Sequence, residues 1–241
     1  MLTDILGIDY PIIMAPMFLV TNVEMMVEAI NGGIAGCVPA LNYRTLPELE
    51  EAIKKVRSLT PGKKGLGINL IVNKSNIKFP EQLECITKEE FKVDFILTSL
   101  GSPKPVIDAC KGKGIKVFCD VVDVGYAKKV EGLGCDGLVA VNSKAGGHAG
   151  PDPPEKLIPD LLEATKLPVV SAGGIGDYKG VQEMLKLGAC GLSIGSPFIA
   201  CDEAPISKEY KDACVQYGKD DIVFTNKISG TPCTAINTPY V

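Results

Sequence analysis

Residues 168–197 read PVVSAGGIGDYKGVQEMLKLGACGLSIGSP, and this stretch contains two successive examples of one pattern. An apolar run at 168–172 is followed by a glycine turn and a helical pattern at 178–187. A second apolar run at 191–194 then ends in another glycine turn. Apart from Ser171 and Ser193, both runs are apolar rather than alternating between apolar and polar residues, which is typical of parallel strands buried on both faces. The stretch therefore predicts consecutive strand–helix units.

The same alternation extends back to the N-terminus. Six further apolar runs precede this stretch, at 12–15, 33–38, 66–71, 95–98, 115–121 and 137–141. Helical patterns lie between the runs, at 22–31, 46–59, 80–91, 103–113, 126–133 and 154–166. Eight such units in roughly 200 residues match a closed (β/α)8 TIM barrel. An open doubly wound sheet is the alternative, but its nucleotide-binding turn should follow the first strand. The first run ends in Ala15-Pro16-Met17, and neither G-x-G-x-x-G nor G-x-x-x-x-G-K-[ST] follows it.

The domain organisation follows from where the alternation stops. We predict a single domain over 1–241, with the barrel at about 8–200 and a C-terminal extension at about 201–241. The extension carries a helical pattern at 207–217, a strand-like run at 222–224 and a Gly/Pro/Thr-rich tail, and we expect it to pack onto the barrel. The chain ends soon after Ser229-Gly230-Thr231-Pro232.

Composition argues against several classes of protein. The 25 basic and 29 acidic residues give a net charge of −4, and the chain has no tryptophan, so we expect no nucleic-acid or anionic-membrane partner. We find no signal peptide and no apolar run long enough to span a membrane, which predicts a cytoplasmic protein. The nine cysteines form no C-x-x-C pair and histidine occurs once, so we expect reduced thiols and no metal site.

Two glycine turns end the last two predicted strands, at Ala172-Gly173-Gly174 and at Gly195-Ser196. Glycine lets backbone N–H groups approach an anion closely, and this corner of a TIM barrel commonly binds phosphate. The plain alternative is that these glycines only make tight turns. A bound phosphate would belong either to a substrate or to a cofactor such as FMN.

Other strand ends carry further candidates. Asn69 ends the third strand as an amide among apolar neighbours, where a flavin or a neighbouring loop would supply its hydrogen-bond partners. The Ala15-Pro16-Met17 end of the first strand is rigid and uncharged, and it suits either a flat ring or core packing. Asp120, at the end of the fifth strand, is a further cofactor-binding candidate.

The loop after the sixth strand contains His148, the only histidine, among the small residues of 145–150. Small flanking residues let a loop bring an imidazole over a flat ligand, and imidazole moves protons near neutral pH. His148 is therefore the candidate catalytic residue. The alternative is a surface histidine on a flexible loop.

The chain resembles the nitronate monooxygenase family, formerly called 2-nitropropane dioxygenases, which includes FMN-dependent enoyl-ACP reductases and NAD(P)H:quinone reductases. The matching segments are PIIMAPM at 11–17, GGIAG at 32–36, GIN at 67–69, AGGHAG at 145–150, AGGIG at 172–176 and Gly195-Ser196. This resemblance implies a TIM barrel that binds FMN without a covalent link. It also implies that His148 faces the flavin and acts as base on a nitroalkane or orients its nitronate.

By the same resemblance, the cofactor-binding residues are the strand-end candidates together with the 144–147 segment. The full set is Ala15, Pro16, Met17, Asn69, Asp120, Lys144, Gly146, Gly147, Ala172, Gly173, Gly174, Gly195 and Ser196. We expect a small-molecule substrate and, by analogy, a homodimer.

Two features depart from the family pattern. Lys144 and Val141 stand where many relatives have glutamate and glutamine. Lys144 would pair with a flavin phosphate or an anionic substrate, or point to solvent. Many relatives also continue well past the position of Val241, so we expect part of a lid or dimer surface to be absent.

Three functions remain open from the sequence alone. The leading one is oxidation of alkyl nitronates with O2 on FMN. The second is an enoyl-ACP or quinone reductase in which NAD(P)H reduces the same FMN. The third is a non-catalytic flavin or phospholigand binder.

Overall fold

The computed structural model describes residues 1–227 and 233–239, and its centre is a closed barrel of parallel strands. Going round the barrel, the strands are β1 (Ile12–Met14), β2 (Ala35–Pro39), β3 (Leu66–Ile71), β4 (Phe95–Ser99), β5 (Lys116–Val121), β6 (Gly137–Val141), β8 (Val169–Ala172) and β9 (Gly191–Ile194). β9 pairs with β1 and closes the circle. The predicted (β/α)8 fold is confirmed.

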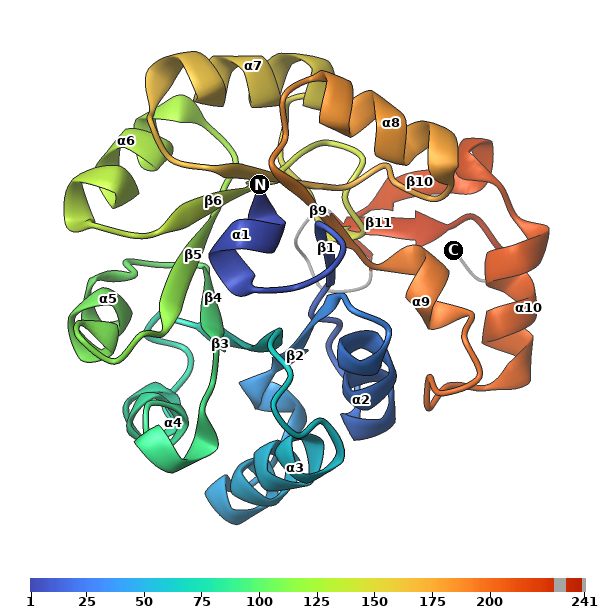
Figure 1. Ribbon diagram of the computed structural model, residues 1–241. Helices are drawn as coiled ribbons and strands as arrows, with labels where there is room; N and C mark the ends of the chain where they lie inside the picture. The colour runs from blue at the N-terminus through green and yellow to red at the C-terminus, as the bar shows by residue number, and fades with distance from the viewer. Residues whose placement is uncertain (228–232, 240–241) are drawn as a thin grey trace.

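Helices surround the barrel in chain order (Figure 1). They are α2 (Val23–Asn31), α3 (Leu46–Leu59), α4 (Phe79–Ile86), α5 (Lys104–Cys110), α6 (Val124–Leu133), α7 (Pro154–Ala164) and α8 (Tyr178–Lys186), with short 3-10 turns η1 (Ala40–Asn42) and η2 (Glu89–Phe91). Each begins where the sequence supplies a start signal. Thr45, for example, accepts a hydrogen bond from the Glu48 N–H in a capping box at the start of α3. The predicted helix at 80–91 is wrong in its length, because α4 ends at Ile86 and η2 follows.

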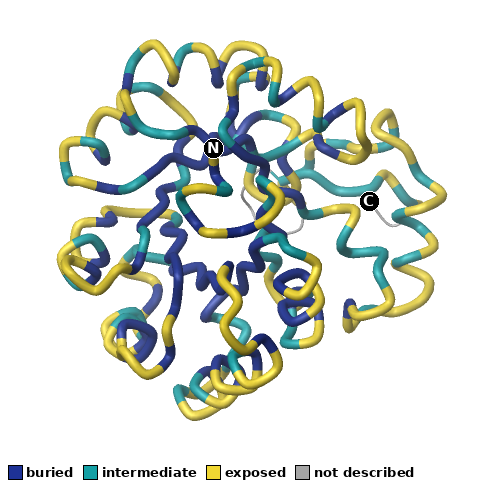
Figure 2. The backbone as a smooth tube through the Cα atoms, in the orientation of Figure 1, coloured by how far each residue is buried: buried dark blue, intermediate teal, exposed yellow. Residues whose placement is uncertain are grey.

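Two buried layers hold the fold together. One lies between the strands and the surrounding helices, and the other fills the barrel interior with residues such as Leu97, Val139 and Val170. In Figure 2 the barrel strands are mostly buried, while the outer faces of the helices are exposed. Phe95 and Phe118 meet edge to face in the interior, with ring centroids 6.0 Å apart.

Glycine makes room for these rings. A Cβ at Gly67 would lie 2.1 Å from Cζ of Phe95, and one at Gly137 would lie 2.6 Å from Cε1 of Phe118. Both glycines therefore belong to the packing of the barrel interior rather than to a turn.

The amino-terminal end of the barrel is covered by α1 (Leu2–Leu6), which lies across its centre in Figure 1. Leu2 is fully buried, and its N–H donates to the Cys190 carbonyl at 2.9 Å. A Cβ at Gly191 would lie 2.5 Å from Cδ2 of Leu2, so the helix packs tightly onto β9. Because α1 covers the amino-terminal end of the barrel, a ligand-binding site is expected at the carboxyl-terminal ends of the strands.

The C-terminal extension is joined to the loop after β6 through β11, which pairs with the short strand β7 (Gly147–His148). A short helix, α9 (Ser196–Ile199), precedes it, and the extension itself contains α10 (Lys208–Gln216), η3 (Lys219–Asp221), β10 (Ile222–Thr225) and β11 (Cys233–Ile236). Residues 228–232 and 240–241, which include the Ser229–Pro232 segment noted in the sequence, lie outside the described residues. α1, α9 and β11 were not predicted.

Among residues 1–227 and 233–239, no helix is long and apolar enough to cross a membrane. The nine cysteines are free thiols, five of them buried.

Candidate active site at the barrel mouth

We use the term barrel mouth for the carboxyl-terminal ends of the barrel strands and the loops that follow them. Every candidate from the sequence lies there. The register places Val141 beside Ala172 and Asp120 beside Val139 on adjacent strands. Ala15, just past β1, donates its N–H to the Ile194 carbonyl at 2.8 Å. The candidates therefore come from strands that are neighbours around one end of the barrel.

The histidine loop is bonded directly to the first glycine turn. Asn142 donates from Nδ2 to the Gly173 carbonyl at 3.1 Å, and the Gly174 N–H donates to the Lys144 carbonyl at 3.0 Å. Asn142 is fully buried, and its Oδ1 also accepts from the Lys144 N–H at 2.8 Å. The loop after β6 and the turn after β8 therefore form one bonded unit.

Glycine is required in this unit. Gly173 and Gly174 have φ of 113° and 76°, in the region that side chains rarely adopt. A Cβ on Gly173 would lie 2.5 Å from the Ala145 backbone nitrogen and 2.6 Å from Oδ1 of Asn142. The close approach of two backbone segments and the positive φ explain Gly173 without a ligand, so the alternative that these glycines only make a tight turn accounts for part of this motif.

The neighbouring backbone is accessible to a ligand. A Cβ on Gly176 or on Gly146 would meet nothing within 4 Å, and one on Gly195 would meet Met17 Sδ only at 3.6 Å. Backbone that is this open fits an anionic group such as a phosphate. At the start of α8, the Gly180 N–H is not free for a ligand, because it donates to Oδ1 of Asp177 at 2.8 Å.

Lys144 is directed along the surface. Its Nζ lies 2.9 Å from Oε1 of Glu155 in the first turn of α7, and both side chains are about half exposed. Its aliphatic part lies close to Gly174, where an added Cβ would be 2.9 Å from Lys144 Cδ. Lys144 thus forms an ion pair with Glu155, a partner that was not predicted from the sequence.

His148 lies on a short strand, β7 (Gly147–His148), that was not predicted. β7 pairs antiparallel with β11, which pairs in turn with β10, so that Cys233 lies opposite His148 and Thr234 opposite Gly147. Thr234 also donates from Oγ1 to the Ala145 carbonyl at 3.1 Å. His148 is exposed. The C-terminal extension therefore fixes the backbone that carries the imidazole.

Polar side chains of three adjacent strands are hydrogen-bonded in series on the opposite side of the mouth. Asn69 of β3 donates from Nδ2 to Ser99 Oγ of β4 at 2.8 Å, and Ser99 donates to Asp120 Oδ2 of β5 at 2.5 Å. Burial raises the pKa of the Asp120 carboxyl to about 7, and the hydrogen bond from Ser99 opposes this rise. A carboxyl group that titrates near neutral pH is typical of functional sites.

The loop after β1 completes the mouth. Met17 is half-buried, and its N–H donates to Thr21 Oγ1 at 3.0 Å, while Asn42 donates to its carbonyl at 3.4 Å. Leu19, two residues on, is 65% exposed and has a φ of 58°. Hydrogen bonds to the side chains of Thr21 and Asn42 therefore fix the conformation of this loop, in addition to its connection to β1.

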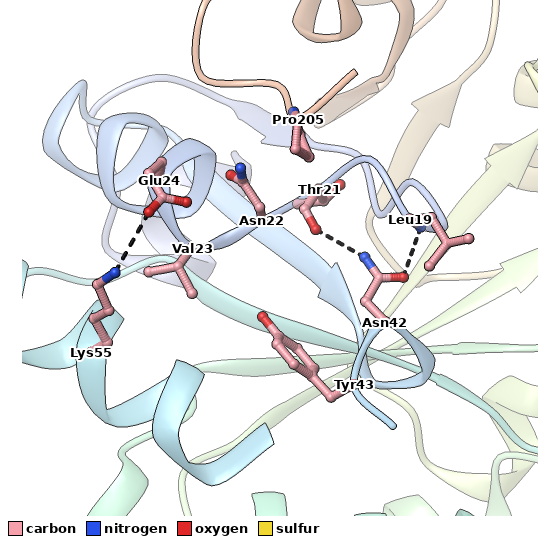
Figure 3. Close-up of a pocket in the computed structure, with 9 residues that line it drawn as sticks. All are labelled: Leu19, Thr21, Asn22, Val23, Glu24, Asn42, Tyr43, Lys55 and Pro205. Carbon is pink, nitrogen blue, oxygen red and sulfur yellow. Dashed lines mark hydrogen bonds and ion pairs between the residues drawn. The ribbon is translucent and has the colours of Figure 1, made fainter. Parts of the chain in front are cut away.

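A pocket of about 290 Å³ lies on the outer side of this loop (Figure 3). The lining residues come from the loop, α2, η1, α3 and the segment before α10, and they are Leu19, Thr21, Asn22, Val23, Glu24, Asn42, Tyr43, Lys55 and Pro205. None of the sequence candidates lines it. Burial raises the pKa of Tyr43, at its floor, to about 12.

Sequence reasoning missed Ser99 and the β11 residues that hold β7. Ser99 could have been found from strand parity, because side chains at alternate positions of β4 face the barrel interior and Ser99 shares a face with Phe95 and Leu97. No local signal marks Thr234 or Cys233 as partners of a loop that lies 89 residues earlier.

Comparison with known proteins places these features in a family. The family model described as nitronate monooxygenase matches residues 1–241. A probable nitronate monooxygenase from Staphylococcus haemolyticus is 30% identical over 283 residues, covering 100% of this chain and 78% of the relative. A (3aS,4S,5R,7aS)-5-hydroxy-7a-methyl-1-oxo-octahydro-1H-indene-4-carboxyl-CoA dehydrogenase from Rhodococcus jostii is 29% identical over 240 residues. The chain spans 66% of that relative's length.

Solved structures give the same fold. FabK from Thermotoga maritima superposes with a TM-score of 0.90 at 28% identity, covering 99% of this chain and 75% of that one. A nitroalkane oxidase from Streptomyces ansochromogenes superposes with a TM-score of 0.86 at 22% identity, covering 98% of this chain and 78% of that one. At that identity the likeness to the nitroalkane oxidase concerns the fold.

Proposed function

The chain belongs to the nitronate monooxygenase family, and from that premise we propose that it is an FMN-dependent oxidoreductase that oxidises alkyl nitronates with O2. The observation that carries the proposal is the bonded unit at the mouth. The loop that bears the only histidine is hydrogen-bonded to the Gly173-Gly174 turn, so a ligand held by the glycine turns would lie next to that loop.

The residues present fit a flavin. The open backbone at Gly176 and at Gly195-Ser196 would hold its phosphate, and Asn69 would hold the ring edge or the ribityl hydroxyls. When bound, FMN supplies the electron acceptor for the substrate and passes the electrons to O2. The protein contributes placement and proton transfer.

His148 would accept the proton from the carbon that bears the nitro group, or would orient the nitronate once it has formed. Imidazole is suited to this step because its ordinary pKa lies near neutral pH. β7 holds the histidine backbone through its pairing with β11, while the side chain is exposed and can reach a substrate.

Two relatives favour a second candidate, an enoyl-ACP or quinone reductase in which NAD(P)H reduces the same FMN. FabK from Thermotoga maritima is more similar in sequence than the nitroalkane oxidase is, at 28% against 22%. The Rhodococcus jostii relative is named as a dehydrogenase of a CoA-linked substrate.

One experiment separates the two candidates. Protein reconstituted with FMN is mixed anaerobically with an alkyl nitronate, with NADH or with NADPH, and flavin absorbance is followed. We expect bleaching by the nitronate. Bleaching only by a nicotinamide selects the reductase, and a protein that takes up no FMN overturns both. If FMN binds but no donor bleaches it, and His148→Ala changes neither result, the protein is a non-catalytic flavin binder.

A further inference from the structure

The carboxamide of Asn69 is held through both of its amide hydrogens. Nδ2 donates to the Leu97 carbonyl at 3.1 Å and to Ser99 Oγ at 2.8 Å. A backbone carbonyl can only accept, so the atom facing Leu97 has to be the NH2 group. Within the described residues, Oδ1 accepts no hydrogen bond and is not among the buried unpartnered atoms. The amide oxygen therefore reaches accessible space at the barrel mouth.

Ser99 connects the Asn69 amide to the Asp120 carboxyl group. Its oxygen accepts from Asn69, and a hydroxyl has a single hydrogen, which it donates to Asp120 Oδ2 at 2.5 Å. Both hydrogen bonds of the series are therefore donated in the same direction: Asn69 donates to Ser99, and Ser99 donates to Asp120. Asp120 ends the series as the acceptor that keeps the Ser99 hydrogen away from Asn69.

We propose that Asp120 is a positioning residue that acts through Ser99 to keep the Asn69 amide oxygen facing the barrel mouth, so that this side of the mouth binds an N–H or O–H donor of the ligand. The inference rests on the proposed function in one respect, namely that the ligand is a flavin. The imide N–H and the ribityl hydroxyls of a flavin are such donors.

The surroundings of Asp120 make this arrangement dependent on pH. The groups whose pKa values respond to its charge are Cys37 of β2, Cys119 of β5 and Tyr126 of α6, none of which is a cation. Ionisation therefore rests on the hydrogen bond from Ser99 against the cost of burial. The ionised carboxylate is the stronger acceptor, so the series is held most firmly above the pKa of Asp120.

The first test uses the protein without cofactor. The side-chain amide of Asn69, labelled with ¹⁵N and assigned with Asn69→Ala, is followed by NMR against pH, together with the Asp120 carboxyl carbon. We expect both to shift with one midpoint near pH 7. In Ser99→Ala the amide should lose this shift while Asp120 titrates at a higher pH. An amide that ignores pH in the wild type, or whose shift survives in Ser99→Ala, overturns the proposal.

The second test measures the dissociation constant of FMN. Ser99→Ala should weaken binding about tenfold, the value of about one hydrogen bond, and the matched variant Ser99→Thr, which keeps the hydroxyl, should restore it. Equal FMN affinity in Ser99→Ala and the wild type overturns the role of the series in binding. If neither protein binds FMN, the proposed function fails, while the NMR titration still decides whether Asp120 positions Asn69.

Discussion

Replacing Gly173 with alanine tests the bonded unit at the barrel mouth most directly. The new Cβ would lie 2.5 Å from the Ala145 backbone nitrogen and 2.6 Å from Asn142 Oδ1, at a φ of 113°. The backbone conformation alone costs about 1–2 kcal/mol with a side chain. Moving Asn142 and Ala145 away would break two or three hydrogen bonds at about 1 kcal/mol each. We expect Gly173→Ala to lose about 3–5 kcal/mol of unfolding free energy.

Urea unfolding of the cofactor-free protein measures this loss, and FMN titration of the folded variant measures the effect on the site. Gly176→Ala is the matched control, since its Cβ would meet nothing within 4 Å and Gly176 has no positive φ. That control should stay within about 0.5 kcal/mol of the wild type. If Gly173→Ala is equally stable and binds FMN equally well, the contact between the histidine loop and the glycine turn is not the one described.

Three further predictions concern single side chains. His148→Ala should keep FMN affinity and lower a proton-transfer-limited turnover by about 10²–10⁴-fold, as steady-state kinetics and flavin titration can check. Ser171→Ala should unfold at a higher urea concentration than the wild type. In the described part of the chain, Ser171 Oγ is the one buried side-chain polar atom without a hydrogen-bond partner. A lower unfolding midpoint in this variant would show that the hydroxyl has a partner. Because the pKa of Asp120 is raised in the folded state, its contribution to stability is full below pH 3.8 and lost as pH rises toward about 7. Asp120→Asn should remove this part of the slope of unfolding free energy against pH, and an unchanged slope would contradict it.

The barrel could be read from the sequence because its signals are local. The runs at 66–71, 137–141 and 191–194 coincide with β3, β6 and β9, and the helix predicted at 46–59 coincides with α3. Buried parallel strands are apolar at nearly every position, and the apolar residues of amphipathic helices recur every three to four residues, so neither signal needs knowledge of distant partners.

What could not be read depends on contacts between distant segments. β7 and β11 are short, and β7 exists as a strand only because β11, itself paired with β10, lies beside it. The ion pair of Lys144 with Glu155 depends on where α7 begins relative to the loop. In the sequence, Ser99 is an ordinary residue at the end of a strand. Only the closed barrel places Asn69 and Asp120 on either side of it.

The pairing of β7 with β11 means that two distant parts of the chain share control of the imidazole. The barrel sets where the loop begins, at Asn142, and the extension sets where the loop is anchored, opposite Cys233. Substitutions in the extension can therefore retune the reach of His148 without disturbing a single barrel strand. With His148 in its proposed role, the substrate range of the enzyme would respond to changes in residues that lie outside the barrel.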